Sequence, residues 1–549
     1  MNADFVRDAV SRFGDDPEGI GRFRKMVIGL AIAGKLAGEG QRRSPAEMLD
    51  QIESEKIRLL RFSEISKPKR FPPVIDEQLP EGFADASAFA PLGAIARIEK
   101  GLTGIQSAKS GSFPLVVTAA ERGSCDHFDF EGAATIVPLV SSTGHGNASI
   151  NRLHYQEGRF ALGTILAAIF PYAPDLISAR FIFEYLSTFK DELLVSRMTG
   201  TANVTLSVGK IAEVPIPLIC PTVQRKADAL MTLCDQLEAA RAEREAARDK
   251  LTLSTLAKLN TPDPETFGQD ARFALANLAP LTTRPDQIKQ LRQTILNLAV
   301  CGKLVEQDTS DEPSTFIIEE IAGLIVNGGR RGKRKACDGE PISTECPAGW
   351  HWTKLSSLAM FENGDRSSNY PSGSDIRSEG VPFISTKAIS NHAVSLDAVD
   401  FVSPEKFASL RSGKAQHLDI LITLRGSVGK FGLFSETDRY KTGFINAQLL
   451  ILRCLKVDLV PFLLTYMRSD GFAEQIRKLS SGSATPQLSA GQLASVDLPL
   501  PPLAEQHRIV AKVDGLMALC DQLEASLITG EQTRSCLLEA VLHNALEPA

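Results

Sequence analysis

The heptapeptide Leu233-Cys-Asp-Gln-Leu-Glu-Ala239 occurs a second time, letter for letter, as Leu519-Cys-Asp-Gln-Leu-Glu-Ala525. The two copies lie 286 residues apart in a chain of 549 residues. That spacing is far longer than the period of a solenoid repeat and indicates two tandem half-molecules. A protein built from two related halves is expected to do one thing at two places.

The similarity continues on the N-terminal side of each heptapeptide. Four further pairs of segments match: Gly200–Ser207 with Gly482–Ser489, Val214–Leu218 with Val496–Leu500, Ile20–Leu36 with Ile288–Leu304, and Leu79–Phe83 with Cys346–Trp350. The first two pairs are 282 residues apart, so the second copy has four extra residues before its heptapeptide. Four residues are about one helical turn. Each half is therefore expected to contain a helix, a linker, a globular segment, a proline-rich turn and a long helix.

Long helices are predicted over residues 222–258 and 503–545. Apolar residues recur along both at spacings of three and four, which is typical of a seam that packs one helix against another. These residues are Ala227, Leu230, Cys234 and Leu237 in the first helix, and Ile509, Val513, Leu516, Cys520, Leu523 and Leu527 in the second. We expect the two long helices to pack against each other, antiparallel. Shorter apolar helices are predicted over residues 20–36 and 288–304, each ending in Gly-Lys.

The globular segments, residues 83–213 and 350–495, lack a helical period and contain short strand-like runs. The clearest runs are Phe113–Thr118, Ala134–Val140, Val381–Ser385 and Ile420–Leu424. Both segments place a turn of small residues after a strand, at Ser141–Asn147 in the first and Arg425–Lys430 in the second. Similar frameworks with divergent sequences indicate two modules that read two different things.

Composition and local motifs narrow the class of protein. Nine cysteines without a Cys-x-x-Cys pair or a zinc-like spacing to histidine argue against a zinc site and favour a reducing compartment. The N-terminal residues lack the order of a signal peptide, and the longest apolar run, Met26–Gly34, is too short to span a bilayer. We therefore expect a cytoplasmic protein that does not bind a membrane.

Charge gives a weak signal for nucleic acid. The net charge of the chain is −6, and the stretches 79–219 and 347–501 carry 10 basic against 13 acidic residues and 16 against 14. Non-specific electrostatic binding to DNA should therefore be weak. The strongest basic clusters are Arg330–Lys335 and, more faintly, Lys67–Arg70. Each is either a solvated linker or a segment that approaches a phosphate backbone.

Taken together, these segments resemble the specificity subunit of type I restriction-modification systems over essentially the whole chain. The resemblance is carried by Leu291–Leu304, Pro347–Trp352, Leu421–Lys430 and Leu498–Ile509, in the order in which the family has them. The first half departs from the pattern, with Cys220-Pro-Thr-Val-Gln224 where the second half has Pro501-Pro-Leu-Ala-Glu-Gln506, and with Phe83 in place of Trp350.

The resemblance implies an α+β fold with two mixed α/β target recognition domains, separated by long antiparallel, coiled-coil-like helices in a pseudo-twofold tandem repeat. It also implies double-stranded DNA, two methyltransferase subunits and restriction subunits as partners. S-adenosylmethionine, ATP and magnesium are then expected on those partners and no cofactor on this chain. The expected domains are 1–78 (helical segment and linker), 79–219 (first recognition domain), 220–325 (central helices), 326–346 (basic linker), 347–501 (second recognition domain) and 502–549 (C-terminal helix).

Catalytic motifs are missing from the sequence. The nearest approach to the Asn/Asp-Pro-Pro-Tyr/Phe motif of amino-methyltransferases is Ile169-Phe-Pro-Tyr172, and Gly426–Lys430 is too short for a phosphate-binding loop. We therefore expect no catalytic residue and no metal site. Two alternatives stay open: a coiled-coil adaptor that binds only proteins, and, less favoured, a DNA methyltransferase or nuclease. The adaptor would leave two large, divergent modules unexplained.

DNA reading needs hydrogen-bonding groups at base edges and phosphate contacts that set the register. Two modules on a rigid spacer form a ruler, in which helix length fixes the gap between half-sites. The candidate contact residues are Ser142, Thr143, His145 and Asn147 in the first module and Arg425, Ser427 and Lys430 in the second, with a further set of Thr201, Asn203, Ser483, Thr485 and Gln487. The alternative for each of them is an ordinary turn residue without a contact to DNA. Arg425 is the strongest single candidate, because a guanidinium matches guanine O6 and N7 bidentately.

Overall fold

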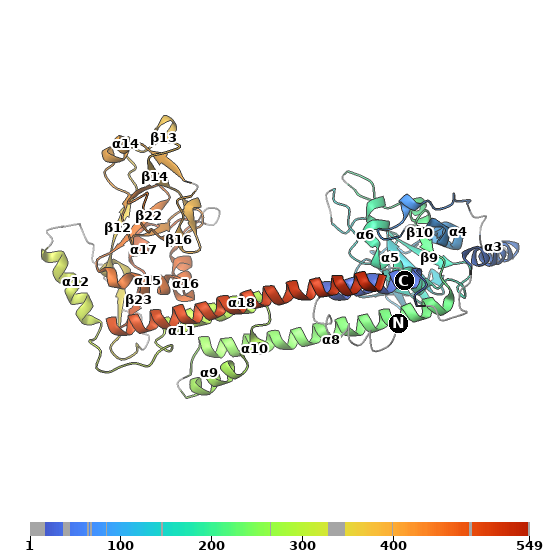
Figure 1. The fold of residues 1–549 in the computed structure, drawn as a ribbon, viewed down its shortest axis with the longest axis horizontal. Helices are drawn as coiled ribbons and strands as arrows, with labels where there is room; N and C mark the ends of the chain where they lie inside the picture. Colours follow the sequence, from blue (N-terminus) through green and yellow to red (C-terminus); the bar gives the residue numbers. More distant parts are fainter. Residues whose placement is uncertain are drawn as a thin grey trace. The chain divides into compact units, whose positions relative to one another are not determined.

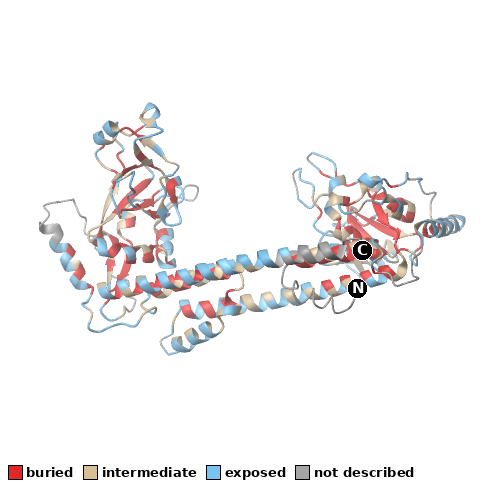
Figure 2. Cartoon of the chain, viewed as in Figure 1, coloured by how far each residue is buried: buried red, intermediate tan, exposed pale blue. Residues whose placement is uncertain are grey.

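The computed structural model describes residues 17–36, 44–62, 65, 69–83, 85–143, 146–201, 203–263, 265–327, 346–397, 399–482 and 486–546 (Figure 1). The chain divides into two compact units, residues 1–246 with 529–549, and residues 247–528. Each unit contains one β-rich module, and buried residues concentrate inside the modules (Figure 2). The basic cluster Arg330–Lys335 lies outside the described residues.

The first module runs from β1 to β10 and has two four-stranded sheets, of order β2-β9-β6-β7 and β4-β3-β8-β5, besides the β1–β10 ladder. Its strands are β1 Phe89–Pro91, β2 Ala96–Lys100, β3 Phe113–Val116, β4 Gly123–Cys125, β5 Phe130–Glu131, β6 Ala134–Pro138, β7 His154–Gln156, β8 Arg159–Leu162, β9 Leu166–Pro171 and β10 Pro215–Pro217. Its helices are α4 Leu92–Ile95, α5 Ala179–Thr188, α6 Lys190–Leu193 and α7 Val208–Ala212. The first sheet is antiparallel throughout, whereas β3 and β8 are parallel.

The second module runs from β11 to β23 and has sheets of order β12-β22-β19-β20-β16-β15 and β13-β17-β14-β21-β18, besides the β11–β23 ladder. Its strands are β11 His351–Lys354, β12 Ala359–Asn363, β13 Ile376–Arg377, β14 Val381–Ile384, β15 Ile389–Ser390, β16 Ala393–Val394, β17 Asp400–Val402, β18 Lys414–Ala415, β19 Ile420–Thr423, β20 Phe431–Leu433, β21 Gly443–Ile445, β22 Leu449–Cys454 and β23 Asp497–Leu500. Its helices are α13 Leu355–Leu358, α14 Pro404–Ser409, α15 Val460–Met467, α16 Asp470–Leu479 and α17 Ala490–Ala494.

The two modules share one strand plan. The antiparallel order β2-β9-β6-β7 reappears as β12-β22-β19-β20, and the parallel pair β3–β8 reappears as β14–β21. The ladder that closes the module is β1–β10 in one and β11–β23 in the other. The four strand-like runs predicted from the sequence are strands β3, β6, β14 and β19. The prediction that the two modules share a framework is therefore confirmed at the level of topology.

The long helices are α8 (Pro221–Asn260) and α18 (Leu503–Leu546). The heptapeptide begins 12 residues after the start of α8 and 16 residues after the start of α18. The four extra residues therefore form one additional helical turn in α18 before its heptapeptide, as the sequence predicts. The boundary between the two units falls inside both helices, after Ala246 in α8 and after Ile528 in α18.

Each seam is buried against a short helix of its own unit. Helix α2 (Pro17–Ile32) packs on the first part of α8, where Ala227, Met231 and Cys234 are buried. Helix α11 (Pro285–Val300) packs on the first part of α18, where Val513, Met517 and Cys520 are buried. The residues predicted for the seams are therefore interface residues. Their immediate partners are the short helices α2 and α11, which was not predicted from the sequence.

An arginine fixes the register of each helix pair in the same way. Arg24 of α2 pairs with Asp235 at 2.6 Å and Glu238 at 3.1 Å. Its counterpart Arg292 of α11 pairs with the acids at the matching heptapeptide positions, Asp521 at 2.7 Å and Glu524 at 2.9 Å. The four carboxylates are about half exposed or, for Asp521, more than half exposed, so each pair contributes at most about 1 kcal/mol. The buried side chains supply the stability, and the arginines define which turn meets which.

Within the second unit, α11 also contacts the end of α8. Asp249 accepts a hydrogen bond from Arg284, and Asn260 donates one to Thr294, so α8 and α11 run parallel there. Helix α18 runs antiparallel to α11. Arg292 of α11 pairs with the heptapeptide of α18. Gly302, beyond the end of α11, lies against Trp350, and Trp350 bonds to the first turn of α18. The end of α8 and the start of α18 are thus antiparallel within this unit.

Glycines end both short helices earlier than the sequence predicted. Helices α2 and α11 end at Ile32 and Val300, four residues before the predicted ends at 36 and 304. Gly34 and Gly302 have φ of 70° and 66°, a conformation that favours glycine. The next residue then donates back into the helix, Lys35 to the Leu30 carbonyl and Lys303 to the Leu298 carbonyl. Both ends therefore have the geometry of a Schellman cap.

Four helices were not predicted individually. They are α3 Pro45–Arg61, α9 Phe267–Ala276, α10 Leu278–Leu281 and α12 Thr315–Asn327. They lie in the segments 1–78 and 220–325 that were expected to be helical, with α12 ending two residues beyond the second segment. Helices α3 and α12 form another repeated pair, since the buried residues Met48 and Ile52 of α3 match Ile317 and Ile321 of α12. Their identity between the halves is too low to be seen without the fold.

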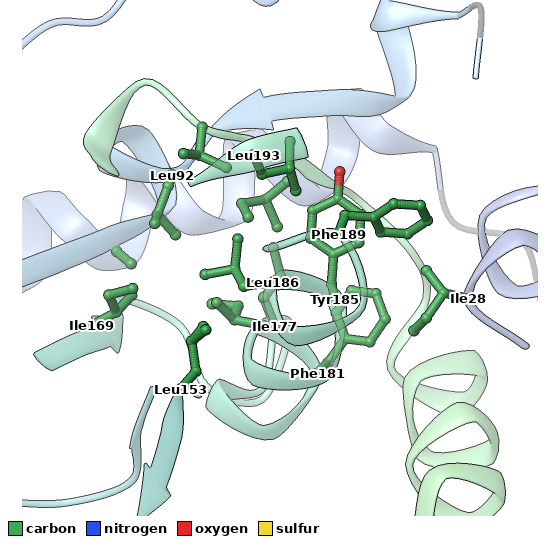
Figure 3. Close-up of a cluster of buried hydrophobic side chains, with 14 of the residues drawn as sticks. Ile28, Leu92, Leu153, Ile169, Ile177, Phe181, Tyr185, Leu186, Phe189 and Leu193 are labelled. Atoms are coloured by element: carbon green, nitrogen blue, oxygen red, sulfur yellow. The ribbon is translucent and has the colours of Figure 1, made fainter. Parts of the chain in front are cut away.

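The joint between module and helix differs in one residue pair. Trp350 donates a hydrogen bond of 2.9 Å from Nε1 to Glu505 of α18, and both residues are buried. At the equivalent positions the first half has Phe83, which packs edge-on against Phe189, and Val223, which is buried. Figure 3 shows the core beside this joint, where Ile28 of α2 lies near Phe181 and Tyr185 of α5. A polar pair in one half thus replaces an apolar pair in the other.

No helix among the described residues is both long enough and apolar enough to cross a membrane.

Candidate nucleic-acid interface

The two turns named from the sequence lie at the same place in the strand plan. Ser141–Asn147 falls between β6 and β7, and Arg425–Lys430 falls between β19 and β20. Each turn pairs with a hairpin at the end of its module: Val140 bridges Thr205, and Arg425 bridges Gln487. These hairpins carry the second set of predicted residues. Among the described residues, the structure therefore places each turn beside the hairpin that carries Thr201 and Asn203 in the first module and Gln487 in the second.

The first-module turn is built largely by its own hydroxyl groups. Ser142 Oγ accepts a hydrogen bond from the Asn151 amide at 3.0 Å, and Thr143 Oγ1 lies 2.8 Å from Ser149 Oγ. Both residues remain exposed at the surface. Asn147 is also exposed, and its side chain has no hydrogen bond to another described residue. Asn147 is thus the more available donor and acceptor, whereas Ser142 and Thr143 shape the loop.

The turn and the closing hairpin of the first module approach each other closely. Gly146 has φ of 83°, and a Cβ on it would lie 2.8 Å from the Thr201 carbonyl oxygen. Thr201 and Asn203 are exposed beside it. The position of Gly146 therefore requires glycine both for its backbone angle and for this contact. His145 lies outside the described residues.

The second-module turn is held by backbone hydrogen bonds. Its frame is held by the Thr423 amide, which donates to the Lys430 carbonyl at 2.8 Å, and by the Gly429 amide, which donates to the Thr423 carbonyl at 3.0 Å. Arg425, Ser427 and Lys430 project from this frame and are exposed. Neither Arg425 nor Lys430 has an ion pair or a side-chain hydrogen bond to any described residue. Both cations are therefore available to an external anion or acceptor.

The hairpin of the second module is described only in part. Gln487 is exposed, and its backbone forms two hydrogen bonds with the backbone of Ser481 on the facing side of the hairpin. The predicted residues Ser483 and Thr485 lie outside the described residues.

One group of side chains has the composition of a metal site. Cys125, Asp126 and His127 follow one another at the end of β4, with His127 Nδ1 2.8 Å from Asp126 Oδ1 and 3.4 Å from Cys125 Sγ. Asp126 and His127 are exposed and bond to each other, which accounts for their closeness without an ion. The Cys-x-His spacing is visible in the sequence and was overlooked there. The absence of a metal from this chain stays a prediction.

Two buried side chains of the first unit, Glu184 and His154, have shifted pKa values. Burial raises the pKa of Glu184 to about 6, although Arg180 and Arg24 lie beside it. Burial likewise lowers the pKa of His154 to about 4, with Arg122 2.9 Å from its ring. Perturbed pKa values often mark catalytic groups. Both side chains are almost fully buried and engaged with arginine, so a substrate has no access to them.

Comparison with known proteins places these modules. Residues 347–529 match the family profile described as the type I restriction modification DNA specificity domain. The chain is 26% identical to the specificity subunit of the type I restriction enzyme EcoAI of Escherichia coli, over 97% of this chain and 94% of that protein. It is 24% identical to the EcoEI specificity subunit of Escherichia coli over the same shares.

A solved structure described as the basis of complex assembly and conformational transition of the type I R-M system is also similar. That chain is 16% identical, the alignment covers 84% of this chain and 97% of that one, and the TM-score is 0.48. The full-length relatives, the matched domain and the two modules of one plan point to the same group of proteins. Residues 347–529 thus match the DNA specificity domain of this family, and nearly the whole chain is similar to specificity subunits of type I restriction enzymes.

Proposed function

We propose that this chain is the DNA-reading subunit of a type I restriction-modification complex and that each module reads one half of an asymmetric, bipartite site. The observation that carries the proposal is the pair of modules with one strand plan and different side chains at the same exposed turn. A shared plan gives both modules the same way of meeting DNA. Different turn residues give them different bases to recognise.

The repeated helices set the gap between the half-sites in this proposal. Equivalent arginines, Arg24 and Arg292, join each short helix to its long helix, so the two modules are attached through equivalent contacts. Methyltransferase subunits bind the helical regions, and restriction subunits join through the complex. S-adenosylmethionine, ATP and magnesium then belong to those partners, and the complex works in the cytoplasm on DNA.

Exchange of one module tests the reading role. Residues 83–213 are replaced by the corresponding segment of a relative with a different site, and methylated motifs are mapped by sequencing in cells that carry the partner subunits. One half of the motif should change, and the other half and the gap should stay the same. The reciprocal exchange of residues 350–495 is the matched control and should change the opposite half. Changes in both halves from one exchange would refute independent reading.

Catalysis is tested separately. The purified chain, incubated with DNA and labelled S-adenosylmethionine, should transfer no methyl group, and it should not cut DNA with ATP and magnesium. Methyl transfer by the chain alone would place chemistry here that the proposal assigns to its partners.

A further inference from the structure

A polar depression of about 330 Å³ lies in the second module beside the predicted turn. Its wall comes from four places: the end of β12, the turn at Arg425, the closing hairpin and the start of α17. The longer polar side chains that line it are Asn363, Arg366, Arg425, Gln487 and Gln492. Arg425 and Gln487 were predicted from the sequence as separate contact residues, whereas Asn363, Arg366 and Gln492 were not predicted.

The lining residues divide into those engaged by the fold and those that are available. Arg366 donates to the Ala447 carbonyl at 3.0 Å, and Gln492 donates to the Leu479 carbonyl at 2.7 Å. In contrast, the side chains of Asn363, Arg425 and Gln487 are exposed and bond to no other described residue. The fold thus brings one guanidinium and two amides to the same depression and leaves their hydrogen-bonding groups available to a ligand.

The charge of the depression favours an electron-rich partner. Two arginines and no carboxylate line it. The acids nearest in sequence are engaged elsewhere: Asp365 is buried and accepts from the Ser367 and Arg411 amides, and Glu362 accepts from the Gly413 amide. A ligand with acceptors directed at the guanidinium therefore meets little opposing negative charge.

These three residue types match the major-groove edges of purines. A guanidinium donates two hydrogen bonds to guanine O6 and N7, and a carboxamide both accepts from adenine N6 and donates to adenine N7. Resting on the proposed function, we infer that this depression is the base-reading site of the second module. Arg425 contacts a guanine, and Asn363 and Gln487 each contact a neighbouring adenine.

The first module does not repeat this arrangement. The strand plan puts Lys100 at the position of Asn363, since each ends the first strand of its sheet. The bridge between Val140 and Thr205 takes the place of the bridge between Arg425 and Gln487. None of these residues offers the paired donor and acceptor of an amide or the fork of a guanidinium. Purine reading from this position is therefore particular to the second module, and the two half-sites differ.

The test uses the full chain assembled with its partner subunits and a DNA library randomised in both half-sites. Arg425→Ala and Arg425→Lys should each relax the preference at one G·C pair, in the half read by the second module. The expected loss is about 5- to 150-fold, from about 1–3 kcal/mol per bidentate contact. Arg425→Lys keeps the charge and removes the fork, so it separates base reading from phosphate attraction. Asn363→Ala and Gln487→Ala should relax a neighbouring A·T pair.

Lys430→Ala is the matched control on the same turn. It removes one exposed cation, so affinity should fall equally for all sequences, with base preference unchanged. A uniform fall in affinity from the Arg425 variants, an unaltered preference, or a change in the other half-site would overturn the inference. Module exchange keeps this result distinct from the proposed function. If exchange alters one half-site and the Arg425 variants do not, the depression is not the reading site although the module still reads.

Discussion

Lengthening the two long helices by one turn each should widen the preferred gap between the half-sites. The perturbation is an insertion of four helix-forming residues after Arg244 in α8 and another after Gly530 in α18. Residues 238–247 and 521–533 contain no buried residue, so neither insertion divides a packed seam. Both helices must be lengthened, because the boundary between the units crosses both.

The size of the effect follows from helix geometry. Four residues add about 6 Å at about 1.5 Å per residue, against about 3.4 Å per base pair of B-DNA. The gap should therefore grow by about two base pairs. Four residues also turn the helix by about 40° beyond a full turn, whereas two base pairs turn DNA by about 70° in the same right-handed sense. The mismatch of about 30° is small enough for both modules to stay in contact with DNA.

The assay is sequencing of methylated motifs in cells that carry the partner subunits. Both half-sites should be unchanged, with the new gap preferred. Insertions of two residues at the same places are the control, because they rotate the far ends by about 200° and should abolish methylation. If the four-residue variant methylates at the original gap with full preference, the helices support the modules but do not measure distance.

Three further predictions concern the joints and the core. Trp350→Phe leaves the buried Glu505 without its indole donor and should lower the free energy of unfolding by about 1–3 kcal/mol, as measured by denaturant titration. Adding Glu505→Val copies the apolar pair of the first half and should restore most of the lost stability. The pKa of Glu184 is raised by burial to about 6, so the folded state holds its proton more tightly and stability falls as pH rises from about 4.5 to 6. Glu184→Gln should remove about 2 kcal/mol of that fall, and a pH dependence equal to that of the parent chain would contradict the assignment. Gly302→Ala should destabilise the protein by about 1–3 kcal/mol, because φ at this position is 66° and a Cβ would lie 2.7 Å from Pro347. Gly323→Ala is the control: it has open space around it in α12 and should be neutral or stabilising by up to about 1 kcal/mol. Equal shifts in melting temperature for the two variants would contradict this prediction.

The repeat made the fold predictable from sequence in those parts where both halves keep their residues. The heptapeptides, the seam residues and the Gly-Lys ends all lie where local rules decide structure, and they are found in helices and helix ends. The partners of the seams were not predictable, because a stripe of leucines shows that a helix packs without showing against what. Helices α3 and α12 escaped notice because their buried pairs, Met48 with Ile52 and Ile317 with Ile321, share a pattern but few letters.

The candidate site was predictable in location and not in membership. A turn of small residues after a strand marked the regions of Asn147 and Arg425, and both are exposed in the structure. Asn363 could not be assigned, because it joins Arg425 only through the pairing of strands far apart in the chain. Ser142, in contrast, has the composition of a contact residue, yet its hydroxyl accepts from a backbone amide. Sequence shows which side chains can bond to DNA, and folding decides which of them are left free to do so.

The joint between module and helices has a consequence for how such proteins change over generations. Arg24 and Arg292 pair with acids at equivalent positions of the two heptapeptides. Gln224 and Gln506 each donate a hydrogen bond to the backbone carbonyl five residues earlier. A gene with this pattern encodes one attachment point twice, on stretches of similar sequence. Recombination within those stretches would deliver a whole foreign module onto contacts that it already fits. A new DNA preference can then arise in one genetic exchange, without a series of destabilised intermediates.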